Sequence, residues 1–155
     1  MKPARILLID DPVPYRNRHA VRQDGAKPSF GIGVAQRYSA GVMTEEDLCS
    51  LGPAIRAVCA PEAVIYAWAT GANLDMAFRI MTARGFVYVT IAMVWAKTYP
   101  KSGGSFYGAG RHVPSNAELL LQWRLPKSPG VFYPNTGSKP NQIVTAPHPR
   151  DERGK

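Results

Sequence analysis

Apolar runs alternate along the chain with helical patterns and long polar stretches. The first run, Ile6 to Ile9, is four consecutive aliphatic residues, and this continuity predicts a strand buried on both faces. Runs rich in aliphatic, β-branched and aromatic residues predict further strands at 63–68, 86–95, 117–124 and 142–145. The alternation of strands with helical segments favours an α/β protein with a partly parallel sheet and flanking helices.

Helix signals separate the first three strands. Thr44 followed three residues later by Asp47 predicts an N-terminal cap, and helical character is expected to resume after Pro53 and reach about Cys59. Asn73 is expected to cap a second helix, which ends at Gly85. The apolar face of this helix is expected to consist of Leu74, Ala77, Phe78 and Met81. The last strands lack intervening helices, so the edge of the sheet is expected to be mixed.

Two long polar stretches, residues 16–43 and 96–115, are predicted loops. Compact domains seldom keep loops of this length unless the loops are functional or disordered. The first is rich in arginine and glycine, which makes it a candidate lid over an anionic substrate, with a surface insertion as the alternative. The second interleaves basic and aromatic residues, a composition that holds phosphates and stacks bases.

The length and net charge of the chain indicate a single domain with an anionic partner. The 155 residues suit one domain, and the net charge of +8 with a pI near 9.8 favours an anionic partner, most often nucleic acid. A generally basic protein is the alternative reading of this charge. No apolar run approaches the ~18–20 residues that span a membrane, so no membrane partner is expected. Cys49 and Cys59 lack metal-ligand spacing and are expected to be reduced, buried thiols in the cytoplasm.

The candidate catalytic residues follow the end of the first predicted strand. Open α/β sheets bind ligands at the carboxyl ends of their strands, and Asp10, Asp11 and Pro12 follow the first run directly. A site that alkylates an exocyclic base amine needs acceptors for the amine protons and a flat face for the base. Asp10 and the carbonyl of Asp11 or Pro12 are candidate acceptors, and Tyr15 is a candidate stacking platform. Magnesium binding and a hydrogen-bonded turn are alternatives for the two acids.

The same segment resembles a known family. Asp10 to Asn17 (Asp-Asp-Pro-Val-Pro-Tyr-Arg-Asn) is similar to the Asp-Pro-Pro-Trp motif, with nearby Tyr and Asn, of the MT-A70 family of adenine-N6 methyltransferases in its small bacterial and phage form. Six further segments resemble family motifs in the same order: Tyr38 to Leu48, Tyr66 to Gly71, Arg84 to Phe86, Val94 to Lys97, Gly108 to Leu121 and Ile143 to Pro147.

The resemblance implies a fold and an activity. The fold would be a Rossmann-like methyltransferase domain in permuted order, spanning 1–155, with the two long loops as substrate gates. The activity would be S-adenosylmethionine-dependent methylation of adenine N6 in DNA, with RNA less favoured, by a phage or prophage enzyme in the cytoplasm of a bacterial host. A homodimer or heterodimer is compatible with it.

Individual roles are also carried over from the family. The catalytic residues would be Asp10, Asp11, Pro12 and Tyr15, and the cofactor would contact Asp10 and Lys155. The substrate would contact Asn17, Tyr38, Trp68, Trp95, Lys97, Arg111, His112 and Glu118. Plainer roles are alternatives for several of these: core packing for the two tryptophans, a solvated lysine at 97 and a surface ion pair at 118.

Two departures from the family motifs keep other functions open. Val13 replaces the aromatic residue of the motif, and the family's later cofactor-binding segment has no counterpart in the sequence. A catalytically inert homologue that binds nucleic acid or a partner protein is therefore the alternative. A metal-dependent nuclease that uses Asp10 and Asp11 is a third hypothesis. The histidines are too scattered to predict a metal site.

Overall fold

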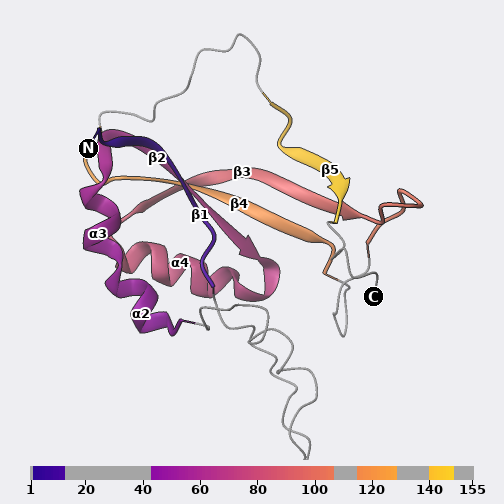
Figure 1. The fold of residues 1–155 in the computed structure, drawn as a ribbon, viewed down its shortest axis with the longest axis horizontal. Helices are drawn as coiled ribbons and strands as arrows, with labels where there is room; N and C mark the ends of the chain where they lie inside the picture. Colours follow the sequence, from indigo (N-terminus) through magenta and orange to yellow (C-terminus); the bar gives the residue numbers. More distant parts are fainter. Residues whose placement is uncertain (1, 13–42, 107–114, 129–139, 149–155) are drawn as a thin grey trace, which may run out of the picture.

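Five strands form one mixed sheet in the computed structural model, which describes residues 2–12, 43–106, 115–128 and 140–148 (Figure 1). The elements are β1 (Ala4–Ile9), α2 (Glu45–Ser50), α3 (Gly52–Ala57), β2 (Cys59–Thr70), the 3-10 turn η1 (Gly71–Asn73), α4 (Leu74–Ala83), β3 (Val87–Thr98), β4 (Ala117–Arg124) and β5 (Ile143–Pro147). The prediction of an α/β protein with a partly parallel sheet is confirmed. No helix in the described residues combines the length and apolar character needed to cross a membrane.

The strand order is β1-β2-β4-β3-β5. β1 is parallel to β2, and β3 is parallel to β5, while β4 is antiparallel to both of its neighbours. The mixed pairing was predicted at an edge, but it lies inside the sheet. The crossover through α4 carries the chain from β2 to β3 in the same direction. The antiparallel β4 then pairs with both strands and fills the space between them.

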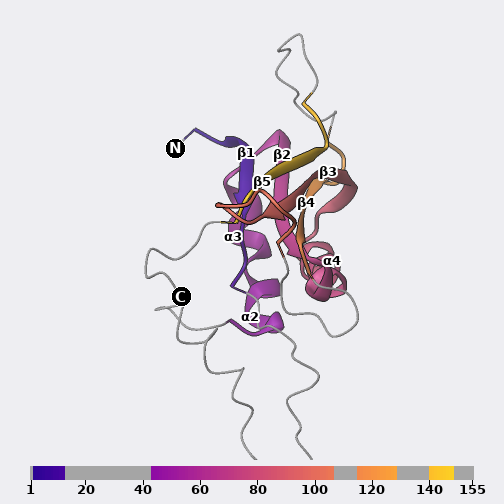
Figure 2. The ribbon, with the colours of Figure 1, turned by 90° about the vertical axis from the view of Figure 1, so that its right-hand side faces the viewer.

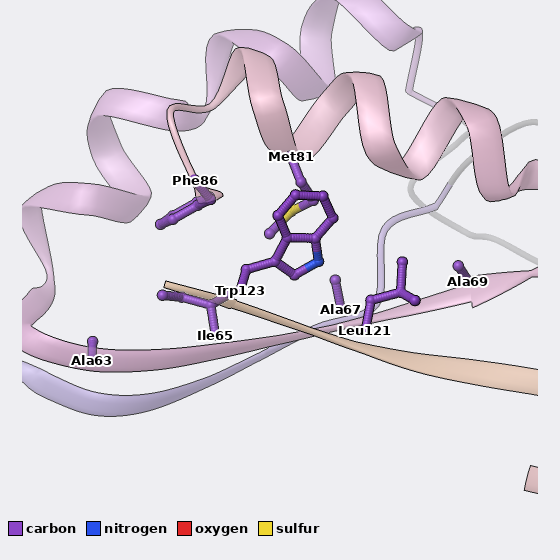
Figure 3. Packing of buried hydrophobic residues seen from close by; sticks show 8 residues of the cluster. All are labelled: Ala63, Ile65, Ala67, Ala69, Met81, Phe86, Leu121 and Trp123. Atoms are coloured by element: carbon purple, nitrogen blue, oxygen red, sulfur yellow. The ribbon is translucent and has the colours of Figure 1, made fainter. Parts of the chain in front are cut away.

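The α-helices of the described chain lie on one side of the sheet (Figures 1 and 2). Alternate residues of β2, from Ala63 to Ala69, point toward this helical layer, as strand geometry requires. Trp123 of β4 rises between Phe86 and Met81, and all three side chains are buried (Figure 3). The apolar face predicted for α4 packs against this core, but only its Met81 is buried. The prediction missed Met76 and Ile80, which are buried with Leu48 of α2 in a second cluster.

Local capping agrees with the sequence at the first helix. The Asp47 amide donates to Thr44 Oγ1 at 3.1 Å, and the Thr44 amide donates to Asp47 Oδ2 at 3.1 Å, which completes a capping box. The Thr44 hydroxyl, which donates to Asp47 Oδ2 at 2.7 Å, and the Thr44 amide together lower the pKa of Asp47. The following helix ends earlier than predicted, because α3 stops at Ala57 and Cys59 already begins β2.

Several boundaries and burial predictions were wrong. β1 is an edge strand whose outward face is open, since Ile6 is 54% and Leu8 65% exposed. β2 begins before its predicted start, and β3 continues to Thr98, into the predicted second loop. Sheet pairing extends these strands past the limits that composition sets. Cys49 and Cys59 are free thiols, but they are only half-buried.

Glycines allow a close contact between α3 and the turn after α4. Gly85 has a φ of +84° and follows Arg84, the C-cap of α4, so it stops the helix as predicted. A Cβ on Gly52 would lie 2.8 Å from the Cα of Arg84. Arg56 of α3 also donates a hydrogen bond to the Arg84 carbonyl oxygen. These contacts fix the backbone of Arg84, whose side chain reaches Asp11 after β1.

Candidate functional site

A cavity of about 170 Å³ opens where the parallel strands β1 and β2 end. The start of the antiparallel β4 lies at the same end, because Thr70 pairs with Glu118. The cavity is lined by Asp10, Asp11, Ala67, Trp68, Ala69, Thr70, Asn73, Ala77, Ile80, Met81 and Glu118. Its floor is apolar and its mouth carries carboxylates, the arrangement expected at the ligand-binding end of an open sheet.

The two acids after β1 have different surroundings. Asp11 accepts two hydrogen bonds from Arg84, from Nη1 to Oδ2 and from Nη2 to Oδ1, each at 2.8 Å. Asp10 is exposed at the cavity mouth and has no ion-pair partner among the described residues. The structure therefore leaves Asp10 available for a ligand and gives Asp11 a structural partner. The ion pair uses only the Asp11 side chain, so the predicted acceptor role of the Asp11 backbone carbonyl stays a prediction.

Arg84 was not expected to take part in the site. Its side chain is fully buried, and its Nε donates to the Leu48 carbonyl oxygen at 2.8 Å. The guanidinium thus joins α2, the end of α4 and the turn after β1. The only sequence signal was its place in the Arg84 to Phe86 segment, which predicts a turn and gives no indication of a buried charge.

The carboxyl group of Asp10 has a raised pKa. Partial burial at the cavity is the largest cause, followed by the negative charges of Glu118 and Asp11. All three effects disfavour the charged form of Asp10.

The structure brings four of the predicted substrate residues together beside this cavity. The rings of Trp68 and Trp95 meet edge to face with centroids 6.4 Å apart. Lys97 Nζ lies 5.0 Å from the centre of the Trp95 ring and forms an ion pair with Glu118. The alternative of a solvated lysine is wrong, since the Lys97 side chain is only 12% exposed. The ion-pair alternative for Glu118 agrees with the structure.

An aromatic stack continues from these residues along the strand ends. The His148 ring lies between Phe106, at 4.7 Å and 7° between planes, and Trp95, at 6.2 Å and 13°. Trp95 Nε1 also donates to the Ala146 carbonyl oxygen at 3.0 Å. No role for His148 was predicted, because its ring partners come from β3 and from the turn that follows β3.

Asn73 and Thr70 are two further residues that sequence reasoning did not place at the site. Asn73 occupies the N-cap position of α4, as predicted, but its side chain makes no capping hydrogen bond. Both polar atoms of its amide and the hydroxyl oxygen of Thr70 are buried without a hydrogen-bond partner among the described residues. Both residues line the cavity. Thr70 lies inside the family-like segment Tyr66 to Gly71.

The remaining predicted site residues divide into two groups. Pro12 is described and half-buried, directly after the acids. Outside the described residues lie Tyr15, Asn17, Tyr38, Arg111, His112 and Lys155. Their roles stay predictions, as do those of the loop 16–43 and of residues 107–114.

The described residues contain no group of three metal-ligating side chains. Both oxygens of Asp11 accept hydrogen bonds from Arg84, so a metal ion shared by the two acids would have to displace a buried guanidinium. This geometry disfavours the nuclease hypothesis.

No protein-family model matches this chain, and no curated protein matches it. The functional interpretation therefore rests on the order of the sequence segments and on the geometry of the cavity.

Proposed function

We propose that this protein is an S-adenosylmethionine-dependent methyltransferase that modifies adenine N6 in DNA. The observation that carries the proposal is Asp10, an acid at the carboxyl end of β1 that faces a cavity while its neighbour Asp11 is held by Arg84. The ordered series of MT-A70-like segments supports it. The sheet, with β1, β2, β3 and β5 pointing in one direction, is compatible with a Rossmann-like methyltransferase fold in permuted order.

The proposed mechanism uses Asp10 as a hydrogen-bond acceptor. The lone pair of an exocyclic adenine amine is delocalised into the ring, so the amine is a poor nucleophile. The Asp10 carboxylate would accept a hydrogen bond from this amine and increase the electron density on its nitrogen. Carboxylate acceptors that stabilise charge developing at a donor lower reaction barriers in this way. Trp68, half-buried at the cavity, would form an apolar wall for the base.

The cavity residues fit one part of the cofactor. When bound, S-adenosylmethionine supplies a methyl group carried on a cationic sulfur. Asp10 and Glu118 place two carboxylates at the cavity mouth, which suits a cationic group, and Lys97 balances one of them. Typical small-molecule sites are about 300–1,000 Å³ in volume. The cavity of about 170 Å³ therefore accommodates a portion of the cofactor or a base.

The net charge of +8 supports a substrate base that is part of a nucleic acid, because lysine and arginine bind phosphate groups. Phosphate contacts by lysine and arginine are independent of sequence, so this charge predicts affinity for DNA without predicting a target. We expect binding that weakens steeply as salt concentration rises.

A second candidate is the catalytically inert homologue that binds nucleic acid or a partner. The small volume of the cavity favours it, together with valine at position 13 of the motif. Isothermal titration of the protein with S-adenosylmethionine distinguishes the two candidates. Measurable heat with a one-to-one stoichiometry supports the enzyme, and its absence supports the inert homologue.

Methyl transfer is the direct test. Incubation with tritiated S-adenosylmethionine and unmethylated DNA of mixed sequence is expected to label N6-methyladenine, identified after digestion to nucleosides. The same DNA already methylated at adenine N6 is the control substrate, and it should accept much less label. A folded protein that labels neither DNA would contradict the proposal.

The raised pKa of Asp10 predicts a shifted pH profile. Only the ionised carboxylate accepts the amine hydrogen bond without competition from its own proton. Activity is therefore expected to fall about tenfold per pH unit below the pKa of Asp10, which lies above its ordinary value of 3.8. The pH dependence of kcat/KM measures this.

Glu118→Gln provides the matched variant for this pH profile. It removes a negative charge that raises the pKa of Asp10 and frees Lys97, whose positive charge acts in the opposite direction. The acid limb of the profile should move to lower pH. A limb that stays at the same pH in Glu118→Gln would show that Asp10 does not control it.

A further inference from the structure

Three buried polar atoms at the cavity have no partner in the described structure: Asn73 Nδ2, Asn73 Oδ1 and Thr70 Oγ1. Native proteins pair the large majority of their buried polar atoms, and each exception calls for an explanation. Asn73 is only 3% exposed, so bulk water does not satisfy its amide. Its two unpaired atoms make the empty protein less stable than an apolar side chain of the same shape would.

Helix capping does not explain Asn73. An asparagine at the N-cap position ordinarily accepts a hydrogen bond from an amide of the first helical turn. Asn73 holds this position on the ten-residue helix α4, but its side chain makes no such bond. Asn73 instead lines the cavity, together with Thr70 and Asp10. The unpaired amide and hydroxyl atoms are closed off from solvent in the empty protein, so a molecule that enters the cavity would reach them through a small shift of the surrounding side chains.

The hydrogen-bonding capacity of the cavity defines the chemistry of this molecule. Asp10 and Glu118 are acceptors when ionised, with one Glu118 oxygen already accepting from Lys97, whereas Asn73 and Thr70 each provide a donor and an acceptor. Acceptors outnumber donors, so the matching ligand carries an amine with at least two N–H bonds. The donors of Asn73 and Thr70 require an acceptor next to that amine. The apolar floor and a volume of about 170 Å³ suit a flat ring, since cavities of about 150 Å³ hold benzene.

We propose that Asn73 and Thr70 recognise the amine-bearing edge of a nucleobase, with Asn73 contacting both the exocyclic amine and the adjacent ring nitrogen. Asparagine makes such a two-point contact with adenine in protein–DNA complexes. The assignment of a nucleobase rests on the proposed function, and the two residues would act as specificity determinants beside Asp10. Adenine and cytosine present this edge. Hypoxanthine and uracil present a carbonyl oxygen, which the carboxylates at the cavity mouth would repel.

Binding of free nucleosides tests the proposal without requiring catalysis. Adenosine, cytidine, inosine and uridine are titrated into the ¹⁵N-labelled protein while the side-chain amide signal of Asn73 is followed by NMR. Comparison with the Asn73→Leu spectrum identifies this signal. We expect adenosine and cytidine to shift it and inosine and uridine to leave it in place. A signal that no nucleoside shifts overturns the proposal.

The Asn73→Leu variant separates recognition from a structural role. Leucine has a similar shape and removes both unpaired atoms. The melting temperature should therefore rise by about 2–6 °C, while adenosine binding weakens by about 5- to 150-fold. An asparagine that stabilises the fold would give a lower melting temperature instead. Such a decrease, or unchanged adenosine affinity, overturns the proposal.

Two more variants complete the test. Thr70→Val is the isosteric change at the second unpaired group, and it should also weaken adenosine binding without lowering the melting temperature. If Asn73→Leu does not fold, the adenosine affinity of Thr70→Val tests the proposal in its place. Asn141→Leu, at an exposed position, controls for the general effect of added apolar surface and should change neither quantity.

The outcomes distinguish this inference from the proposed function. Adenosine binding that depends on Asn73, in a protein without methyl transfer, supports the inference and contradicts the proposed function. Methyl transfer at the wild-type rate by folded Asn73→Leu overturns the inference alone.

Discussion

Replacing Asp11 with asparagine is expected to lower the free energy of unfolding by about 3–5 kcal/mol, because the substitution leaves the buried Arg84 guanidinium without its counter-charge. Arg84 is fully buried, and its two hydrogen bonds to Asp11 both depend on carboxylate oxygens. An amide offers only one acceptor and no negative charge. Denaturation with urea, followed by circular dichroism, measures the loss as a lower midpoint at an unchanged slope.

The adjacent acid provides the matched control for this experiment. Asp10→Asn makes the same chemical change one residue earlier, where no described residue forms an ion pair with the carboxylate. Burial and two negative neighbours raise the pKa of Asp10, so folding destabilises its charged form relative to the unfolded chain. Asp10→Asn should therefore leave stability within about 0.5 kcal/mol of wild type or increase it slightly. Equal losses in the two variants would contradict the roles assigned to the two acids.

A double substitution separates the energy of the ion pair from the cost of a lone charge. Asp11→Leu with Arg84→Met replaces both partners by apolar side chains, a change that is often neutral or stabilising for buried pairs. We expect the double variant to be more stable than Asp11→Asn. A double variant that is less stable than Asp11→Asn would show that the hydrogen bond from Arg84 to the Leu48 carbonyl contributes more than the charge does.

The second large effect concerns catalysis. Asp10→Asn is expected to reduce the kcat of methyl transfer by about 10²–10³-fold, because the amide is a weaker, neutral acceptor for the adenine amine. The carboxylate interacts most strongly as charge develops on the amine in the transition state, so kcat should fall more than KM rises. Steady-state kinetics with labelled cofactor measures both constants.

This kinetic prediction has its own controls. The stability of Asp10→Asn, measured as above, shows whether lost activity comes from unfolding. Asn141→Leu, at an exposed position, should keep wild-type kinetics. Full activity in a folded Asp10→Asn variant would contradict the mechanism and would favour the inert or partner-binding interpretation of the site.

Much of the local structure could be predicted from the sequence because its causes are local. The capping box at Thr44 joins residues three positions apart, and Gly85 ends α4 because its positive φ suits glycine. Helical periodicity identified the face of α4 that contacts the main core, but it missed Met76 and Ile80, which are buried against α2. Strand limits were less accurate, since pairing with neighbours extends β2 and β3 beyond their apolar runs.

The candidate site could be predicted only in part. The position of Asp10 at a strand end followed from the order of apolar and acidic residues, and the structure places it at a cavity. Lys97, Trp95 and Glu118 were expected near the same site and do meet there, but as contacts with one another. The sequence did not indicate that the two neighbouring acids have different surroundings.

The sequence by itself determined the succession of strands and helices, the start of α2, the glycine stop after α4 and the acidic turn after β1, because neighbouring residues specify these features. Tertiary structure decided which acid is paired, since Asp11 and Arg84 are 73 positions apart. It also placed β4 between β2 and β3, and it left Asn73 unpaired beside the cavity. Such contacts depend on strand order and on packing between distant segments, and local residue patterns specify neither the strand order nor this packing.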